Sequence, residues 1–245
     1  MSDVVNLIRA DSVLSSELLR VVNSPIYALR SNVSSVQHAM AMLGYSAAKS
    51  IAMAVSMRSF FCKIVDMDLG RRVWRQSLAS ALIAEELAPG WPLVEREPDR
   101  AYTAGLLHDI GRLGLLVCYQ NEYSKLLMTP AEGPADVLAQ EREAFDIDHC
   151  EAGRWLANEW RLPVEVQTAI AQHHTSPRPG GSELSDVVRA SVLFCALLGL
   201  DAESFRPVST VEQARELLPQ PVRNRLGWDP EAWKARLKKK LDAFD

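Results

Sequence analysis

Apolar residues recur at helical spacing along nearly the whole chain. Leu14, Leu18 and Val22 share one face of a first helical region that begins near Leu7, because residues three and four apart lie on the same side of a helix. Asn23-Ser24-Pro25 ends this region, since proline lacks a backbone donor and disfavours the helical conformation in the residue before it. No segment alternates between apolar and polar residues as a half-buried strand does. The pattern therefore predicts an all-α protein built as a multi-helix bundle.

Further helical segments are separated by capping residues, prolines and glycines. They cover residues 35–42, 47–61, 68–87, 99–118, 122–128, 135–145, 149–160, 163–174, 184–198, 209–217 and 230–244. Residues 175–182 contain two prolines and two glycines and form the clearest loop. A boundary near residues 61–68 predicts a smaller N-terminal helical subdomain, 1–64, and a larger core, 65–245, within one continuous domain.

The composition excludes several classes of protein. The net charge of −4 does not supply the basic face expected of a nucleic-acid-binding protein. The longest strongly apolar stretch, residues 190–200, is too short to span a bilayer, and the first residues lack the pattern of a signal peptide. The four cysteines show no CxxC spacing, as expected in a reducing compartment. We therefore predict a cytoplasmic protein without membrane insertion and without a nucleic-acid partner.

The segment Gly105–Gly111 places a histidine and an aspartate, His108 and Asp109, in an apolar stretch that is predicted to be a buried helix. Charged residues are seldom buried unless they are paired or bind a metal. Adjacent residues of a helix point about 100° apart, so a metal lying between the two directions can contact both side chains. Gly105 and Gly111 each lower helix propensity by roughly 1 kcal/mol relative to alanine, which favours a role in close contact between helices.

Three further histidines follow in ordered relation to this pair. His149 begins one predicted helix, and His173-His174 ends another. We expect these three to meet His108 and Asp109 in space. A single histidine on an apolar helix is more often a satisfied core residue than a ligand, so two interpretations stay open: a site for one divalent transition metal (Fe, Mn, Zn or Ni), or a hydrogen-bonded polar core in which Asp109 stabilises a histidine.

The order of motifs along the chain resembles the HDOD family, a branch of the HD-domain superfamily of phosphohydrolases. The segments that carry the resemblance are Leu18–Pro25, Ser35–Gly44, Val73–Ser77, Ala104–Gly111, Asp148–Ala157, Trp160–Pro163 and Ala169–His174. The resemblance covers almost the whole chain and implies an HD-domain-like helical core.

The resemblance also shows what the site lacks. Catalytic HD proteins, including the HD-GYP cyclic-di-GMP phosphodiesterases, use a histidine in the helix before the HD pair and an aspartate in a later helix. Gln76 stands at the first position, and Ser191 or Val192 falls near the second. The Gly-Tyr-Pro signature after the histidine pair is also missing. Metal-activated water needs a firmly held metal, an open coordination position and an oriented phosphate, so we expect no catalytic residue here.

The resemblance therefore implies a non-catalytic bacterial signal-transduction module, of the kind found in two-component or cyclic-di-GMP pathways. It would act by binding a signalling protein partner or a nucleotide ligand. The alternative is a residual metal-dependent phosphohydrolase that acts on a nucleotide or a cyclic dinucleotide.

Overall fold

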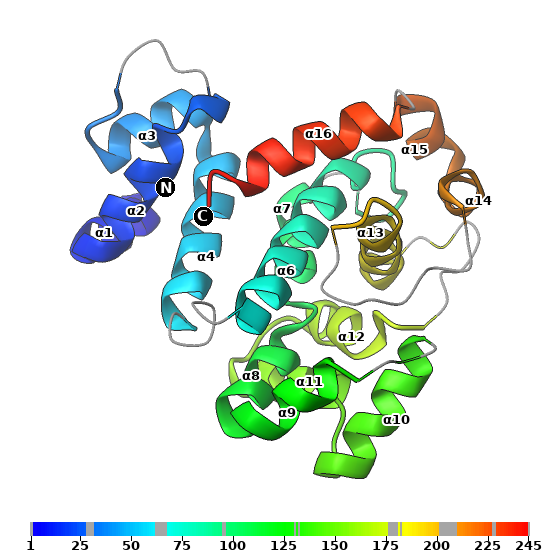
Figure 1. The fold of residues 1–245 in the computed structure, drawn as a ribbon. Coiled ribbons are helices and arrows are strands. Elements are labelled where there is room, and N and C mark those ends of the chain that lie inside the picture. The colour runs from blue at the N-terminus through cyan, green and yellow to red at the C-terminus, as the bar shows by residue number, and fades with distance from the viewer. Residues whose placement is uncertain are drawn as a thin grey trace. The chain divides into compact units, whose positions relative to one another are not determined.

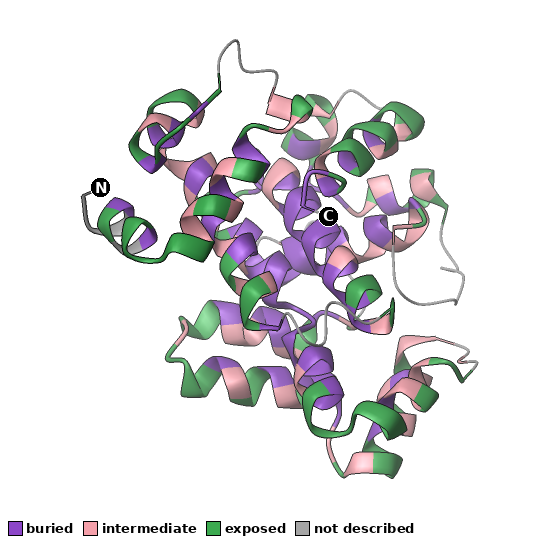
Figure 2. Ribbon diagram, turned by 60° about the vertical axis from the view of Figure 1, so that its left-hand side comes forward, coloured by how far each residue is buried: buried purple, intermediate pink, exposed green. Residues whose placement is uncertain are grey.

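The computed structural model of the chain describes residues 2–27, 32–61, 68–94, 97–129, 131, 133–175, 181, 183–200, 210–226 and 229–244. These residues form helices joined by turns, and no strand occurs among them, as the sequence predicts. Buried residues line the inner sides of the helices, and exposed residues lie on their outer sides (Figure 2). No helix within the described ranges is long and apolar enough to cross a membrane.

The chain divides into two compact units. The first combines Met1–Cys62 with Ala232–Asp245, and the second comprises Lys63–Glu231. The unit that holds the N-terminal helices thus also includes the last residues of the chain, whereas the sequence suggested a division into 1–64 and 65–245. The predicted boundary itself falls mainly on residues 62–67, outside the described part of the chain.

The first unit is a small helical bundle. Its N-terminal helices are α1 (Ser2–Ala10), α2 (Ser12–Val22), α3 (Val36–Leu43) and α4 (Tyr45–Phe60), and most of α16 (Pro230–Leu241) belongs to it as well. The Asn23 side chain both donates to the Val33 carbonyl, at 2.8 Å, and accepts from the Val33 amide, at 2.7 Å. These two hydrogen bonds from one side-chain amide tie Val33 to the end of α2, which η1 (Pro25–Tyr27) follows along the chain.

The second unit is built around α6 (Asp68–Leu87), which packs against α7 (Pro98–Leu107) and α13 (Leu184–Leu197) (Figure 1). A second group of helices continues this core. It contains α8 (Ile110–Cys118), α11 (His149–Glu159) and α12 (Val164–Gln172). Because α11 packs against both α8 and α12, and α12 packs against α7 and α13, the two groups form one continuous interior.

Shorter helices complete the second unit. They are α9 (Gln120–Leu127), α10 (Pro134–Phe145), α14 (Val211–Glu216) and α15 (Gln220–Arg225). α10 buries only Val137 and Glu141 among its described side chains. It is therefore held to the core at few points.

The first helical region differs from the prediction. The expected continuous helix from Leu7 to Val22 is two helices, because Asp11 caps the second of them. Its carboxylate accepts from the amides of Val13 and Leu14, both at 2.9 Å. Aspartate is among the strongest N-cap residues, and here this local bond outweighs the continuous apolar pattern. The helix over 35–42 is confirmed, with Ser35 capping the His38 amide at 3.1 Å.

Candidate functional site

The His108-Asp109 pair lies at the junction of two helices. α7 ends at Leu107, α8 begins at Ile110, and Asp109 is the N-cap of α8. The predicted single helix over residues 99–118 is therefore wrong. α7 packs mainly against α6, whereas α8 packs against α11, so the chain changes direction between them. Both side chains of the pair are completely buried.

Gly105 and Gly111 permit the closest helix contacts around this junction. A Cβ at Gly105 would lie 2.8 Å from the Ala81 Cα of α6, and a Cβ at Gly111 would lie 1.9 Å from the His149 carbonyl oxygen of α11. Neither position can accept a larger residue without a shift of backbone. The predicted role of these glycines in close helix contact is confirmed, and the contact at Gly111 brings the start of α11 against the junction.

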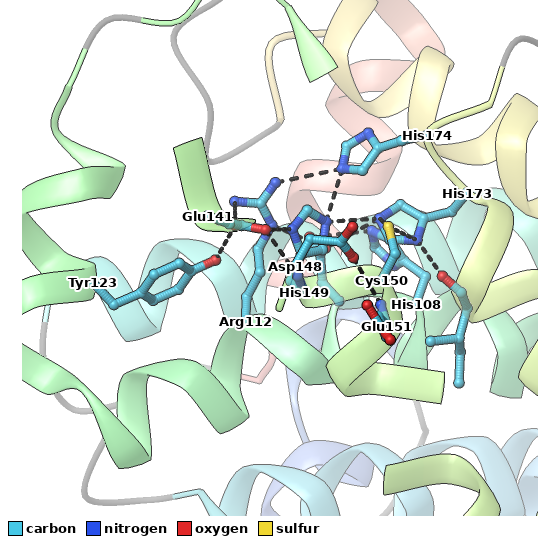
Figure 3. A network of polar contacts seen from close by, with 12 residues as sticks. His108, Arg112, Tyr123, Glu141, Asp148, His149, Cys150, Glu151, His173 and His174 are labelled. Atoms are coloured by element: carbon cyan, nitrogen blue, oxygen red, sulfur yellow. Dashed lines mark hydrogen bonds and ion pairs between the residues drawn. The ribbon is translucent and has the colours of Figure 1, made fainter. Parts of the chain in front are cut away.

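The structure brings the five predicted site residues together in two groups that share His173. One group joins His149 and His174 to His173, together with Cys150, and the other joins His108 and Asp109 to His173. Figure 3 shows the four histidines of the cluster side by side. His149 Nε2 lies 2.9 Å from His174 Nε2 and 3.3 Å from His173 Nε2. Asp109 Oδ1 lies 3.4 Å from His173 Nε2 and 3.6 Å from His149 Nε2. His108 Nε2 faces the other Asp109 oxygen, Oδ2, at 3.3 Å. The side chains therefore direct nitrogen and oxygen atoms toward one region.

In three of the histidine rings, the nitrogen that points away from the cluster, Nδ1, lies against an oxygen that accepts a hydrogen bond. Nδ1 lies 2.7 Å from the Gly105 carbonyl in His108, 2.7 Å from the Ile170 carbonyl in His173, and 2.6 Å from the Glu141 carboxylate in His149. Carbonyl and carboxylate oxygens only accept, so Nδ1 carries the proton in each ring. In a neutral imidazole the Nε2 atom is then a bare lone pair. Three such lone pairs point into the cluster.

This arrangement fits a divalent metal ion. His108 Nε2 and Asp109 Oδ2 face each other at 3.3 Å, are fully buried and make no hydrogen bond, and such atoms are costly unless something binds them. Ligand atoms that are each about 2.1 Å from one metal lie roughly 3.0–3.4 Å apart in octahedral or tetrahedral geometry. The inner atoms of His149, His173 and Asp109 have separations close to that range. Metal-bound histidines also usually donate their outer N–H to a carbonyl or carboxylate, as these rings do.

Three residues that the sequence did not single out complete the network. Arg112 is almost fully buried, and its Nε donates to Asp109 Oδ1 at 3.1 Å. Its Nη2 lies 3.4 Å from His174 Nε2, and its Nη1 lies 3.9 Å from Glu141 Oε1. Tyr123 donates to Glu141 at 2.6 Å. An arginine within an otherwise apolar helix was the one signal available in the sequence, because such a residue needs a partner.

The electrostatics of the cluster keep Asp109 charged and favour the neutral form of His149, His173 and His174. Burial raises the pKa of Asp109, but the attraction of His108 and Arg112 outweighs burial and holds that pKa well below its usual range. Burial lowers the pKa of His149 and His174 strongly and that of His173 to a lesser degree. For His149, the neighbouring Arg112 lowers the pKa further. Neutral imidazole is the form that binds metal.

The stability of the protein in a chelator is expected to fall as the pH decreases below about 6.5. The folded state keeps His149, His173 and His174 neutral, whereas the unfolded chain protonates them near the ordinary value of 6.5. The unfolded state binds more protons in this range, so the free energy of unfolding rises with pH, by at most about 1.4 kcal/mol per pH unit for each ring. Urea midpoints measured from about pH 5 to about pH 8 check this. A midpoint that does not change over this range would contradict it.

Cys150 lies beside the cluster and forms, with His149, His173 and His174, one of the groups of side chains whose atoms are close enough to hold a metal ion. Its Sγ is 3.8 Å from His173 Nδ1 and 4.0 Å from His173 Nε2. Burial raises the pKa of the Cys150 thiol far above its usual range, whereas a metal binds the thiolate. Cys150 would have to lose its proton to bind a metal, whereas the histidines bind as neutral rings. The ligand set predicted from the sequence, without this cysteine, stays a prediction.

The two positions at which catalytic relatives have ligands carry none here. Gln76 is buried on α6, and Ser191 is buried on α13. The Ser191 hydroxyl donates to the Val188 carbonyl of its own helix at 2.8 Å, and Val192 is apolar.

Known proteins with similar sequences and structures support one family. The profile of the HDOD domain family matches residues 1–176. A protein of Treponema pallidum (strain Nichols), named only as uncharacterized, is 27% identical over 177 residues, which are 72% of this chain and 34% of the relative. The chain thus spans about a third of that relative's length.

Solved structures extend the comparison to the fold. An HDOD domain protein of unknown function from Geobacter sulfurreducens is 25% identical, with a TM-score of 0.75, and the match covers 100% of this chain and 85% of that one. The MmoQ response regulator of Methylococcus capsulatus str. Bath is 26% identical, with a TM-score of 0.53 and coverage of 93% and 89%. The family match over most of the chain, together with this all-helical fold, shows that the chain belongs to the HDOD domain family.

Proposed function

We propose that this chain is a non-catalytic regulatory module of signal transduction that holds one divalent transition-metal ion. The observation that supports a bound metal ion is the convergence, in a buried cluster, of the Asp109 carboxylate and of histidine Nε2 atoms that carry lone pairs. The ligands would be His108, Asp109, His149, His173 and His174, and the metal would be Fe, Mn, Zn or Ni. The similarity to a response regulator supports a role in signalling.

Three features favour a regulatory over a catalytic role. First, all the candidate ligands but His174 are buried, and His173 is 3% exposed, whereas catalytic metal sites keep an open coordination position. Second, Gln76, Ser191 and Val192 supply no further ligand. Third, the Arg112 guanidinium already supplies a positive charge next to Asp109 and Glu141, which disfavours a second metal ion there. The metal would then stabilise one arrangement of α8, α11 and α12, and partners would recognise the surface that this arrangement presents.

The metal content of untagged protein is the first test. We expect close to one metal ion per chain in the wild type, and its loss in both His108→Ala and Asp109→Ala, as measured by plasma mass spectrometry. His38→Ala is the matched control, because His38 lies on α3 in the first unit. A wild-type protein without metal would support the alternative of a hydrogen-bonded polar core.

Turnover assays separate this proposal from the residual phosphohydrolase. We expect no hydrolysis of nucleotides or cyclic dinucleotides by the metal-loaded protein. Metal-stimulated hydrolysis that both site variants abolish would refute the non-catalytic role. An increase in melting temperature with a nucleotide, without product, would identify a nucleotide ligand as the signal.

A further inference from the structure

Glu141 makes contacts that a surface helix rarely provides. Its side chain is completely buried although α10 lies at the periphery of the second unit. One carboxylate oxygen, Oε2, accepts from both the backbone amide of His149, at 2.8 Å, and its ring Nδ1, at 2.6 Å. The other, Oε1, accepts from the Tyr123 hydroxyl at 2.6 Å. Glu141 therefore connects α10 to the first residue of α11 through both the backbone and the ring.

The helices α9 and α10 bury few side chains, and two of these side chains belong to the same network. Val137 and Glu141 are the buried residues of α10, and Tyr123 is the buried residue of α9. Burying a carboxylate is costly unless its hydrogen bonds compensate. An apolar side chain would serve packing at this position equally well. The hydrogen bonds to His149 and Tyr123 therefore explain why a glutamate stands there.

We propose that Glu141 is a positioning residue of the metal centre: its bond to Nδ1 keeps the proton on that atom and directs the lone pair of His149 Nε2 into the cluster. The bond to the His149 amide fixes the start of α11, and Tyr123 orients the carboxylate. This inference rests on the proposed metal function. A carboxylate that accepts from the outer N–H of a metal-binding imidazole sets both the tautomer and the basicity of that ring.

Two substitutions separate the hydrogen bond from the charge. Glu141→Gln retains an oxygen that can accept from Nδ1, and its amide can face the Tyr123 hydroxyl. We expect it to keep the Nδ1–H tautomer and to lose roughly 10-fold in metal affinity. Glu141→Leu removes the acceptor, so we expect a mixture of tautomers and a loss of roughly 100-fold. Glu143→Gln is the matched control on the exposed side of the same helix.

The experiment measures two quantities on the full chain. Zn²⁺ affinity is measured by competition with a chromophoric chelator, and the His149 tautomer is measured in metal-free protein by long-range ¹H–¹⁵N correlation of the imidazole. The tautomer would not change if Glu141 served only to anchor α10. Should Glu141→Leu fail to fold, Glu141→Gln and Tyr123→Phe still test whether the charge and the orientation of the carboxylate affect Zn²⁺ affinity, and wild-type affinity in both would overturn the positioning role.

The outcomes distinguish this inference from the proposed function. Wild-type affinity and an unchanged tautomer in the Glu141 variants would overturn the positioning role and leave the metal site intact. A wild-type protein that binds no Zn²⁺ would overturn the metal function, and the positioning of a ligand would fall with it. Graded loss of affinity, with the tautomer lost only in Glu141→Leu, would support both.

Discussion

Replacing Gly111 by alanine is expected to destabilise the second unit by about 3 kcal/mol and to abolish metal binding. The added Cβ would lie 1.9 Å from the His149 carbonyl oxygen and 2.7 Å from the Gly153 amide nitrogen. Both neighbours are backbone atoms of α11, so no side-chain rotation can relieve the clash. The helices α8 and α11 would have to separate, and His149 would move away from Asp109.

The free energy of unfolding in urea, together with Zn²⁺ affinity, checks this prediction. Gly114→Ala is the matched control on the same helix, because its Cβ would meet only the Leu156 Cδ1 atom, at 3.1 Å. There the side chain can adjust, and the gain in helix propensity of about 1 kcal/mol opposes the remaining crowding. A wild-type urea midpoint in Gly111→Ala would show that the two helices do not depend on this contact.

Replacing Arg112 by methionine is expected to destabilise the metal-free protein by about 3–5 kcal/mol. The guanidinium is 1% exposed and lies between the carboxylates of Asp109 and Glu141, with Nε 3.1 Å from the first and Nη1 3.9 Å from the second. Methionine fills similar space but leaves both buried carboxylates without a counter-charge. Removing one partner of a buried ion pair is far more costly than replacing both.

Urea unfolding with and without Zn²⁺ measures this effect. We expect the divalent ion to restore more stability in Arg112→Met than in the wild type, because a second positive charge then replaces the one that was lost. Arg154→Met, at an exposed position of α11, is the control and should change stability by less than about 0.5 kcal/mol. Equal stability of Arg112→Met and the wild type in chelator would contradict the electrostatic role of this arginine.

The sequence was sufficient for the helical class of the fold and for the five residues of the cluster. Helix class follows from apolar spacing, which is a local property. The cluster could be predicted because histidine and aspartate in apolar segments need partners, and the resemblance to the HDOD family ordered them along the chain. The need for glycine at positions 105 and 111 was also predictable, since each lowers helix propensity without an evident local benefit.

The sequence did not predict the ends of helices that are set by a capping hydrogen bond or by packing against a distant helix. The apolar pattern runs without interruption through His108-Asp109. However, α7 packs mainly against α6 and α8 packs mainly against α11, and this difference breaks the helix. The capping bond of Asp11 similarly divides α1 from α2. Apolar periodicity predicts which face of a helix is buried. It does not predict which other helix packs against that face.

The chemistry of the cluster was decided by the tertiary structure. Sequence alone determined that five residues of metal-binding type would meet in an all-α protein. It could not determine that Glu141 would hold the Nδ1 proton of His149, or that Arg112 would reach both Asp109 and His174, which lies 62 residues further along the chain. Protonation and charge in a buried site depend on distances of a few ångströms between side chains, and only the packing of α8, α10, α11 and α12 sets those distances.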